Sequence, residues 1–142
     1  MCIRDSSMTG QRRDLNREKF KFENLISIFN NPESNASRNL KYLSYAMDVR
    51  SKLKGFHPSS VMECLTRGRS DIVVIKRGFG KNAIFAIHNM TENKINFLLN
   101  DKELTGSFEN NINMKDNLSS DKYNSKNISL EPFQVVWLSA LI

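Results

Sequence analysis

A short stretch near the N-terminus carries the residues whose types and spacing are best suited to binding chemistry. It contains Arg12, Arg13, Asp14, Asn16 and Arg17, just ahead of a segment with helical periodicity. A guanidinium offers a planar fork of donors that binds carboxylates or neighbouring hydroxyl groups. Arginine is disfavoured at the positive end of a helix dipole, so these side chains indicate ligands outside the helix. The alternative is a solvated helix start, in which Asp14 or Asn16 serves as the N-cap.

The other side chains that could act in chemistry favour structural roles. His57 lies in a turn and His88 at the end of an apolar strand, and neither has a nucleophile or carboxylate nearby in sequence. Cys64 alternates with Met62, which predicts that the thiol packs as a small apolar group. Trp137 fits either a sugar-stacking platform or a core position on the last strand, and the core position is the interpretation we prefer.

No metal site and no cofactor are predicted. The two cysteines and two histidines lack the spacing of zinc ligands, and they indicate no disulfide framework. Residues 78–81, Gly-Phe-Gly-Lys, resemble part of a phosphate-binding loop, but the spacing is too short and a strand rather than a helix follows. This segment is therefore predicted to be a β-hairpin turn.

Two amphipathic helices are expected to position the N-terminal motif. Residues 14–29 place apolar side chains at three- and four-residue spacing, and Pro32 lies just beyond the end of this pattern. A second helix is expected over residues 36–54, with Ser34 as its N-cap and Gly55 as the left-handed residue that follows it. Two helices of this size cannot bury their apolar faces alone, which indicates missing partners.

After Pro58 the period changes from 3.6 to 2, which indicates an antiparallel sheet. Strands are expected over residues 61–66, 72–77, 83–89, 94–99 and 134–138, with shorter pieces near residue 104 and over 128–130. The polar segment 109–127 is expected to be a long mobile excursion between strands. The predicted fold class is α+β, with two helices followed by a small antiparallel β-sandwich.

Composition and charge limit the classes of binding partner that we expect. The net charge is +6, but the basic residues are scattered, so no nucleic-acid partner is expected. No stretch has the length of a membrane span or the apolar core of a signal peptide, so we expect no membrane partner and a cytoplasmic location. Residues 1–7 read like a translated sequencing adaptor, which predicts an artefact at this end and a native protein that continues upstream.

Three stretches together resemble the C-terminal part of sucrose-phosphorylase-type enzymes of the alpha-amylase superfamily. Residues 9–19 resemble the segment after the eighth barrel strand, and Phe56-His57-Pro58 resembles the joint to the C-terminal domain. The strands of that domain are matched by residues 85–91, 104–106 and 128–138.

The resemblance implies that residues 8–55 are the end of a (β/α)₈ barrel, including its terminal helices, and that residues 56–142 form the C-terminal β-sandwich. It also implies a retaining mechanism with two carboxylates about 5 Å apart, in which inorganic phosphate attacks a glucosyl-enzyme formed from an α-glucoside. The family's three catalytic carboxylates lie upstream of Met8, so no catalytic residue is expected in this chain and the chain alone should be inactive.

One functional position carries over from the family motif Arg-Asp-Ile-Asn-Arg. Arg13 corresponds to the arginine that reaches the bound glucose, and Asp14, Asn16 and Arg17 match the rest of the motif, with Leu15 in place of isoleucine. Active sites of such barrels lie at the carboxyl ends of the strands, where a loop after strand eight would place Arg13. Three alternatives stay open: a hydrolase of the same superfamily, a non-catalytic carbohydrate-binding β-sandwich, and a small basic nucleic-acid-binding protein.

Overall fold

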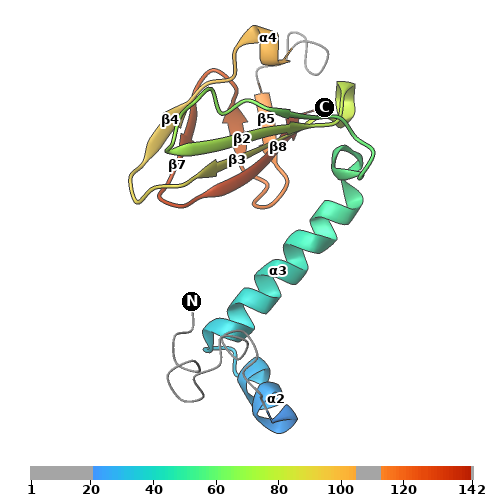
Figure 1. The fold of residues 1–142 in the computed structure, drawn as a ribbon, viewed down its shortest axis with the longest axis vertical. Helices are drawn as coiled ribbons and strands as arrows, with labels where there is room; N and C mark the ends of the chain where they lie inside the picture. Colours follow the sequence, from blue (N-terminus) through green and yellow to red (C-terminus); the bar gives the residue numbers. More distant parts are fainter. Residues whose placement is uncertain (1–20, 105–112, 142) are drawn as a thin grey trace, which may run out of the picture. The chain divides into compact units, whose positions relative to one another are not determined.

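The computed structural model describes residues 21–104 and 113–141. The chain divides between Ser44 and Tyr45 into two compact units. The first contains the helix α2 and most of α3. The second contains the last turns of α3 and the described strands, most of which are labelled in Figure 1.

Helix α2 (Phe22–Asn30) confirms that this segment is helical, and the helix begins at Phe22 rather than continuing through Lys21. Lys21 has an extended backbone, with φ −72° and ψ 135°, so the expected continuous helix over residues 14–29 is wrong at this residue. Asn31 is also extended, because the ring of a following proline disfavours the helical conformation. The helix buries none of its residues, and Phe22 remains 71% exposed.

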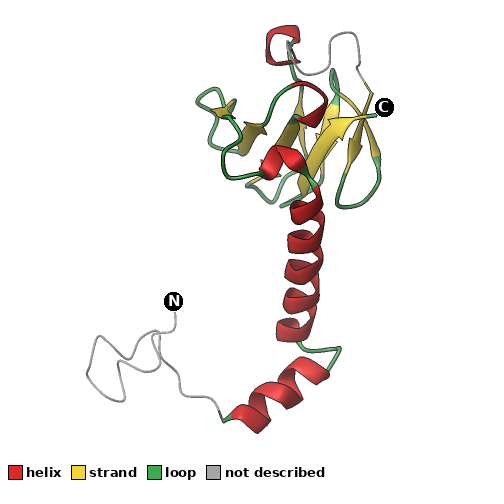
Figure 2. Cartoon of the chain, turned by 90° about the vertical axis from the view of Figure 1, so that its right-hand side faces the viewer, coloured by secondary structure: helices red, strands yellow, loops and turns green. Residues whose placement is uncertain are grey.

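Helix α3 (Asn35–Lys52) is uninterrupted in Figure 2. The expected N-cap is confirmed, since the Ser34 hydroxyl oxygen accepts a hydrogen bond from the backbone N–H of Ser37 at 3.0 Å. The helix ends earlier than expected, and a 3₁₀ turn, η2 (Lys54–Phe56), follows it.

Gly55 is not the expected left-handed residue after α3. The positive-φ glycines of the described chain do not include it. It is buried in η2, where a Cβ atom would lie 2.4 Å from the carbonyl oxygen of Asn82 and 2.7 Å from Cγ1 of Ile84. Glycine is required here by a close approach of two backbones rather than by its own conformation.

The second unit holds two antiparallel sheets. One has six strands in the order β1-β2-β3-β8-β5-β6, and the other pairs β4 with β7. The strands are β1 (Met62–Cys64), β2 (Ile72–Arg77), β3 (Ile84–Asn89), β4 (Ile95–Phe97), β5 (Asn113–Asp116), β6 (Lys122–Asn124), β7 (Ile128–Leu130) and β8 (Val135–Ala140). This arrangement confirms the coarse expectation of an antiparallel β domain in an α+β chain.

The core contains apolar side chains from both sheets. Alternate residues of β2, β3 and β8 contribute Ile72, Val74, Phe85, Ile87, Val136 and Leu138, and the short sheet contributes Ile95, Phe97, Ile128 and Leu130. Cross-strand partners share a face, so the opposite face carries Val73, Ile75, Ala86, His88, Val135 and Trp137. We call this second set the outer face of the six-stranded sheet.

Two expected features of the sheet domain are wrong. The polar segment 109–127 is not wholly an excursion, because its described part forms β5 and β6. A helical turn, α4 (Asp101–Leu104), replaces the strand piece expected near residue 104. Asn100 and Glu103 form a reciprocal cap: each side chain accepts a hydrogen bond from the other's backbone N–H, at 3.1 and 2.8 Å.

Candidate functional site

The predicted sugar-contacting motif lies outside the residues that the structure describes. Arg13, Asp14, Asn16 and Arg17 all precede residue 21. Their proposed arrangement around a ligand therefore stays a prediction from the sequence, as does the assignment of residues 1–7 to an adaptor.

The joint after α3 is built around Phe56. Its ring meets Trp137 edge-on, with centroids 4.8 Å apart and an interplanar angle of 62°. On another side, the guanidinium carbon of Arg50 lies 5.7 Å from the Phe56 ring centroid, within the range of a cation–π contact. Phe56 thus links the last turn of α3 to the outer face of the six-stranded sheet.

Trp137 does not occupy the expected core position. It pairs across the strands with Ala86 on the outer face, whereas its neighbours Val136 and Leu138 point into the core. The indole is half-buried, with Phe56 against it. Sequence periodicity identified the strand, but it could not say which of two apolar faces would be the core.

His57 follows Phe56 in the turn after α3, and its hydrogen bonds are structural. Its Nδ1 accepts a hydrogen bond from the backbone N–H of Ser59 at 3.2 Å, and its carbonyl oxygen accepts one from Nη2 of Arg77 at 2.8 Å. These bonds fix the turn that leads into β1, as the structural interpretation of this histidine predicts.

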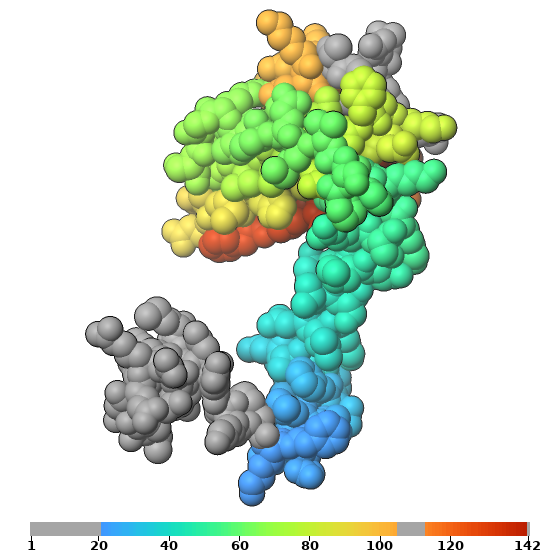
Figure 3. Space-filling view, turned by 45° about the vertical axis from the view of Figure 1, so that its right-hand side comes forward, coloured from blue at the N-terminus to red at the C-terminus, as the bar shows by residue number. Residues whose placement is uncertain are grey.

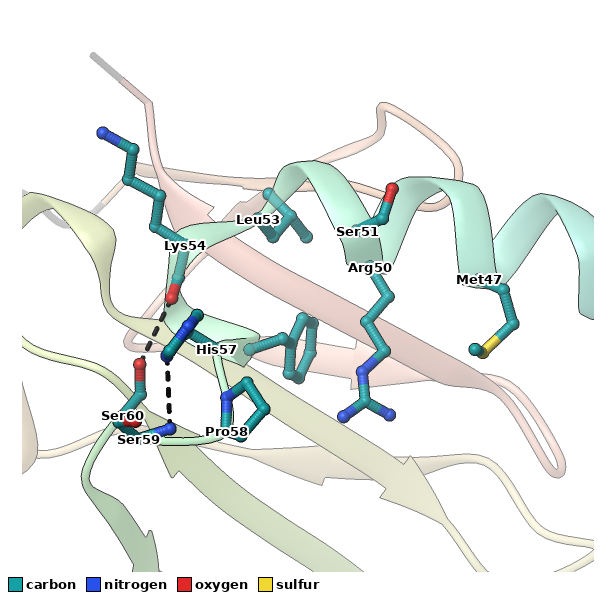
Figure 4. A pocket seen from close by; sticks show the side chains of 10 residues that line it. Met47, Arg50, Ser51, Leu53, Lys54, His57, Pro58, Ser59 and Ser60 are labelled. Carbon is teal, nitrogen blue, oxygen red and sulfur yellow. Dashed lines mark hydrogen bonds between the residues drawn. The ribbon is translucent and has the colours of Figure 1, made fainter.

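A hollow of about 830 Å³ lies beside this joint, entirely within the second unit. Its walls are formed by the end of α3 and the following loop: Met47, Arg50, Ser51, Leu53, Lys54, Phe56, His57, Pro58, Ser59 and Ser60. Figure 4 shows the side chains of Met47 and Arg50 leaving the helix toward Pro58, while the Ser51 hydroxyl points to the other side. This hollow could not be predicted from the sequence, because no motif links Arg50 to Pro58.

A second group of positively charged side chains lies around Phe97, and nearby carboxylates balance its charge. Arg67 and Arg69 flank the Phe97 ring at 5.1 and 5.8 Å from its centroid. Arg67 forms a two-point ion pair with Glu103, and Arg69 pairs with Asp71. Because each guanidinium has its own carboxylate, this group holds loops together and is not a strong anion site.

Cys64 is exposed, so the expected apolar packing of its thiol is wrong. Strand β1 is at the edge of the sheet and all three of its residues are exposed, which leaves no interior for the side chain. Hydrogen bonds with Thr66 lower the pKa of Cys64 below its ordinary value. Figure 3 shows the green segment that carries β1 on the surface of the second unit.

The glycine-rich segment 78–81 confirms the predicted hairpin. It connects β2 to β3, which pair in antiparallel register from Arg77 opposite Ile84. Gly78 and Gly80 have φ values of 76° and 58°, and only the 3₁₀ turn η3 (Gly80–Asn82) precedes the strand. A phosphate-binding loop would need a helix at this point.

Lowering the pH should destabilise the sheet domain through His88. Burial lowers the pKa of His88 below its ordinary value of 6.5, because desolvation penalises the imidazolium. The stabilising effect of the neutral ring is fully present above about pH 6.5 and is lost as the pH falls from there through the lower pKa of the folded state, since the unfolded chain binds the proton more tightly. Urea unfolding followed by Trp137 fluorescence measures this slope.

His88→Leu should remove this slope between about pH 7.5 and 5, the range in which histidine titrates. Asp71 does not interfere in this range, because the Arg69 guanidinium holds the pKa of that carboxyl below 3.8. Parallel curves for the wild-type and His88→Leu chains would contradict this account of His88.

Among the described residues, no group of three or more histidine, cysteine or acidic side chains is placed to hold a metal ion. Within the same part of the chain, no helix has the length and apolar character needed to cross a membrane. Comparison of the chain with protein-family models and with curated proteins gave no match.

Proposed function

We propose that this chain is the C-terminal part of a cytoplasmic, retaining α-glucoside phosphorylase of the sucrose-phosphorylase type. The observation that carries the proposal is the order of its elements. Helices with exposed apolar faces lead through Phe56-His57-Pro58 into an antiparallel domain of two sheets. The same order is implied by the resemblance of the sequence to the end of the barrel and the C-terminal domain of that family.

The exposed helix faces support this proposal. On α3, Leu40 and Leu43 lie at helical spacing and are 46% and 60% exposed. On α2, Phe22 and Ile26 are exposed in the same way. Apolar stripes of this kind are typical of helices that pack against further structure. In the proposed enzyme, the barrel that precedes these helices would cover them.

The proposed chemistry is divided between this chain and the residues upstream of it. Two upstream carboxylates, about 5 Å apart, act as nucleophile and acid/base, so that phosphate replaces the leaving group with retention at the anomeric carbon. Arg13 contributes a charged donor fork to the bound glucose. Asp14 and Glu18 have no catalytic role in this scheme.

The test is to extend the reading frame upstream of Met8 and to compare the longer enzyme with the chain as printed. We expect glucose 1-phosphate from sucrose or a related α-glucoside plus phosphate with the long enzyme only. Turnover by the 142-residue chain alone would contradict the proposal. Release of free glucose without a requirement for phosphate would instead identify the hydrolase alternative.

Arg13→Ala in the extended enzyme should lower kcat/KM for phosphorolysis about 10- to 100-fold, as expected for losing a charged hydrogen bond to the substrate. Arg13→Lys should recover only part of this loss, since an ammonium lacks the planar fork. Lys21→Ala, an exposed position just before α2, is the matched control and should leave the kinetics unchanged. Wild-type kinetics for Arg13→Ala with an intact fold would exclude Arg13 from the site.

The carbohydrate-binding alternative is less favoured, because it requires exposed aromatic rings on one surface. In the sheet domain, Phe79 and Phe133 are 71% and 66% exposed. Phe79 lies before the first residue of β3. Phe133 lies just before Val135, which pairs with His88 near the last residue of β3. The two rings therefore flank opposite ends of the sheet and do not form one stacking platform.

A further inference from the structure

The hollow beside Phe56 has the size and the lining of a small-ligand site. Its volume of about 830 Å³ lies within the range of about 300–1,000 Å³ that is usual for such sites. The surface of the hollow is mostly apolar, with Met47, Leu53, Phe56 and Pro58 on its wall, although six of its ten lining residues carry polar side chains. A mainly apolar surface with polar anchors is typical of sites for amphipathic molecules.

The part of the wall formed by Phe56 and Pro58 is held in place by its surroundings. Phe56 is fixed on one side by its edge-on contact with Trp137. The preceding residue, Gly55, is buried against the backbone of Asn82, which leaves the turn no room to move inward. The ring of Pro58 restricts its own backbone. A ligand would therefore meet a wall that is already in place, which reduces the entropy lost on binding.

The lysine and arginine that line the hollow make its charge positive. Arg50 and Lys54 are in its lining, and the lining contains no aspartate or glutamate. None of the salt bridges between residues that the structure describes involves either cation. Arg50 is exposed, and among the described residues the interaction observed for its guanidinium is with the Phe56 ring. This contrasts with Arg67 and Arg69, which have carboxylate partners.

Backbone carbonyl groups at the end of α3 and in the following turn are hydrogen-bonded within the chain. The carbonyl oxygens of Arg50 and Leu53 accept hydrogen bonds from the following turn, at 3.2 and 3.0 Å. The carbonyl oxygen of Lys54 accepts two, from the His57 backbone at 3.1 Å and from the Ser60 hydroxyl at 3.2 Å, and Figure 4 shows the second. These three carbonyl groups therefore have donors within the chain.

We infer that this hollow binds a small aromatic carboxylate, with the carboxylate on the Arg50 guanidinium and the ring against Phe56 and Pro58. A carboxylate matches the donor fork of arginine with two parallel hydrogen bonds. An aromatic body suits a wall made of a phenyl ring, a proline ring and a methionine side chain. The inference does not depend on the proposed phosphorylase activity, because every residue it uses lies between Met47 and Trp137.

Trp137 is the only tryptophan of the chain and touches the wall of the hollow, so its fluorescence reports on ligand binding. The probe is phenylacetate, titrated into the full chain at constant ionic strength, with amide NMR shifts to locate the response. We expect saturable binding in the low millimolar range, with the largest shifts at residues 47–60. Phenylacetamide, which has the same shape without the charge, should bind at least about 10-fold more weakly.

Arg50→Gln should weaken phenylacetate binding at least about 10-fold, while Arg38→Gln, on an exposed part of the same helix, should leave it unchanged. The Trp137 emission of ligand-free Arg50→Gln checks that its fold is intact. Three results would overturn the inference: no saturable response at tens of millimolar, equal affinity for phenylacetamide, or unaltered binding by folded Arg50→Gln. Should Arg50→Gln not fold, equal affinity for the charged and the neutral ligand remains a decisive result.

Discussion

Asp116→Ala should lower the free energy of unfolding of the sheet domain by about 3–5 kcal/mol, since hydrogen bonds to a charged group each contribute about 1.5–3 kcal/mol. The carboxylate is 1% exposed. Its Oδ1 accepts from the backbone N–H groups of Trp137 at 2.7 Å and Leu118 at 3.2 Å. Its Oδ2 accepts from the backbone and hydroxyl of Ser119, at 3.0 and 2.8 Å. Alanine leaves the part-buried N–H groups of Trp137 and Leu118 without this acceptor.

Urea unfolding followed by Trp137 fluorescence measures this loss, which is a large share of the total of about 5–15 kcal/mol that is usual for a domain. Asp116→Asn should lose less, because one oxygen is kept while an amide N–H₂ faces the remaining donors. Asp121→Ala is the matched control: this carboxylate is exposed and accepts from the same Ser119 hydroxyl, and its loss should cost less than about 1 kcal/mol. Equal losses at positions 116 and 121 would contradict the role assigned to Asp116.

Gly55→Ala should destabilise the same domain by about 3 kcal/mol, the upper part of the range for overpacked sites. The added methyl group would lie 2.4 Å from the Asn82 carbonyl oxygen and 3.2 Å from that of Arg77, and both are backbone atoms that cannot rotate away. The turn would have to move, and Phe56 would move with it away from Trp137. We therefore expect a change in tryptophan emission before unfolding as well as a lower midpoint in urea.

Gly68→Ala is the control that separates the steric collision expected at Gly55 from the strain of a positive φ. Gly68 has φ +74° and nothing within 4 Å of a built Cβ atom, so alanine there meets conformational strain of about 1 kcal/mol and no collision. A loss at Gly55 no larger than the loss at Gly68 would show that the close approach at Gly55 is not limiting.

The central strands could be predicted from the sequence because their pattern is local. β2 was expected over residues 72–77 and forms over the same residues, since alternate side chains point to the core. Ser34 capped α3 as expected, because a serine hydroxyl reaches the third N–H of a helix wherever the chain allows it.

The elements that were predicted wrongly depend on partners distant in sequence. β5 lies in an Asn-, Ser- and Lys-rich segment, and it forms because it pairs with β8 and because Asp116 binds the backbone of Trp137. Met114 and Asp116 do alternate as buried residues, but two positions are too few to identify a strand. Cys64 was misplaced because an edge strand has the same pattern as a covered one.

The two candidate sites also differ in whether the sequence alone could reveal them. The motif around Arg13 is a contiguous run and could be found by resemblance, although it lies outside the described residues. The hollow beside Phe56 could not be found in this way, since its lining within residues 47–60 carries no motif and the ring that holds Phe56, Trp137, is distant in sequence.

The position of β8 has a consequence for how the domain is made. β8 is the last described strand in the chain, yet it lies in the middle of the six-stranded sheet and joins β3 to β5. During synthesis the N-terminal strands can pair only among themselves, as hairpins without a shared centre. The six-stranded sheet can therefore close only after the ribosome has extruded the chain through Ala140, and the strands before β8 share one sheet only from that point on.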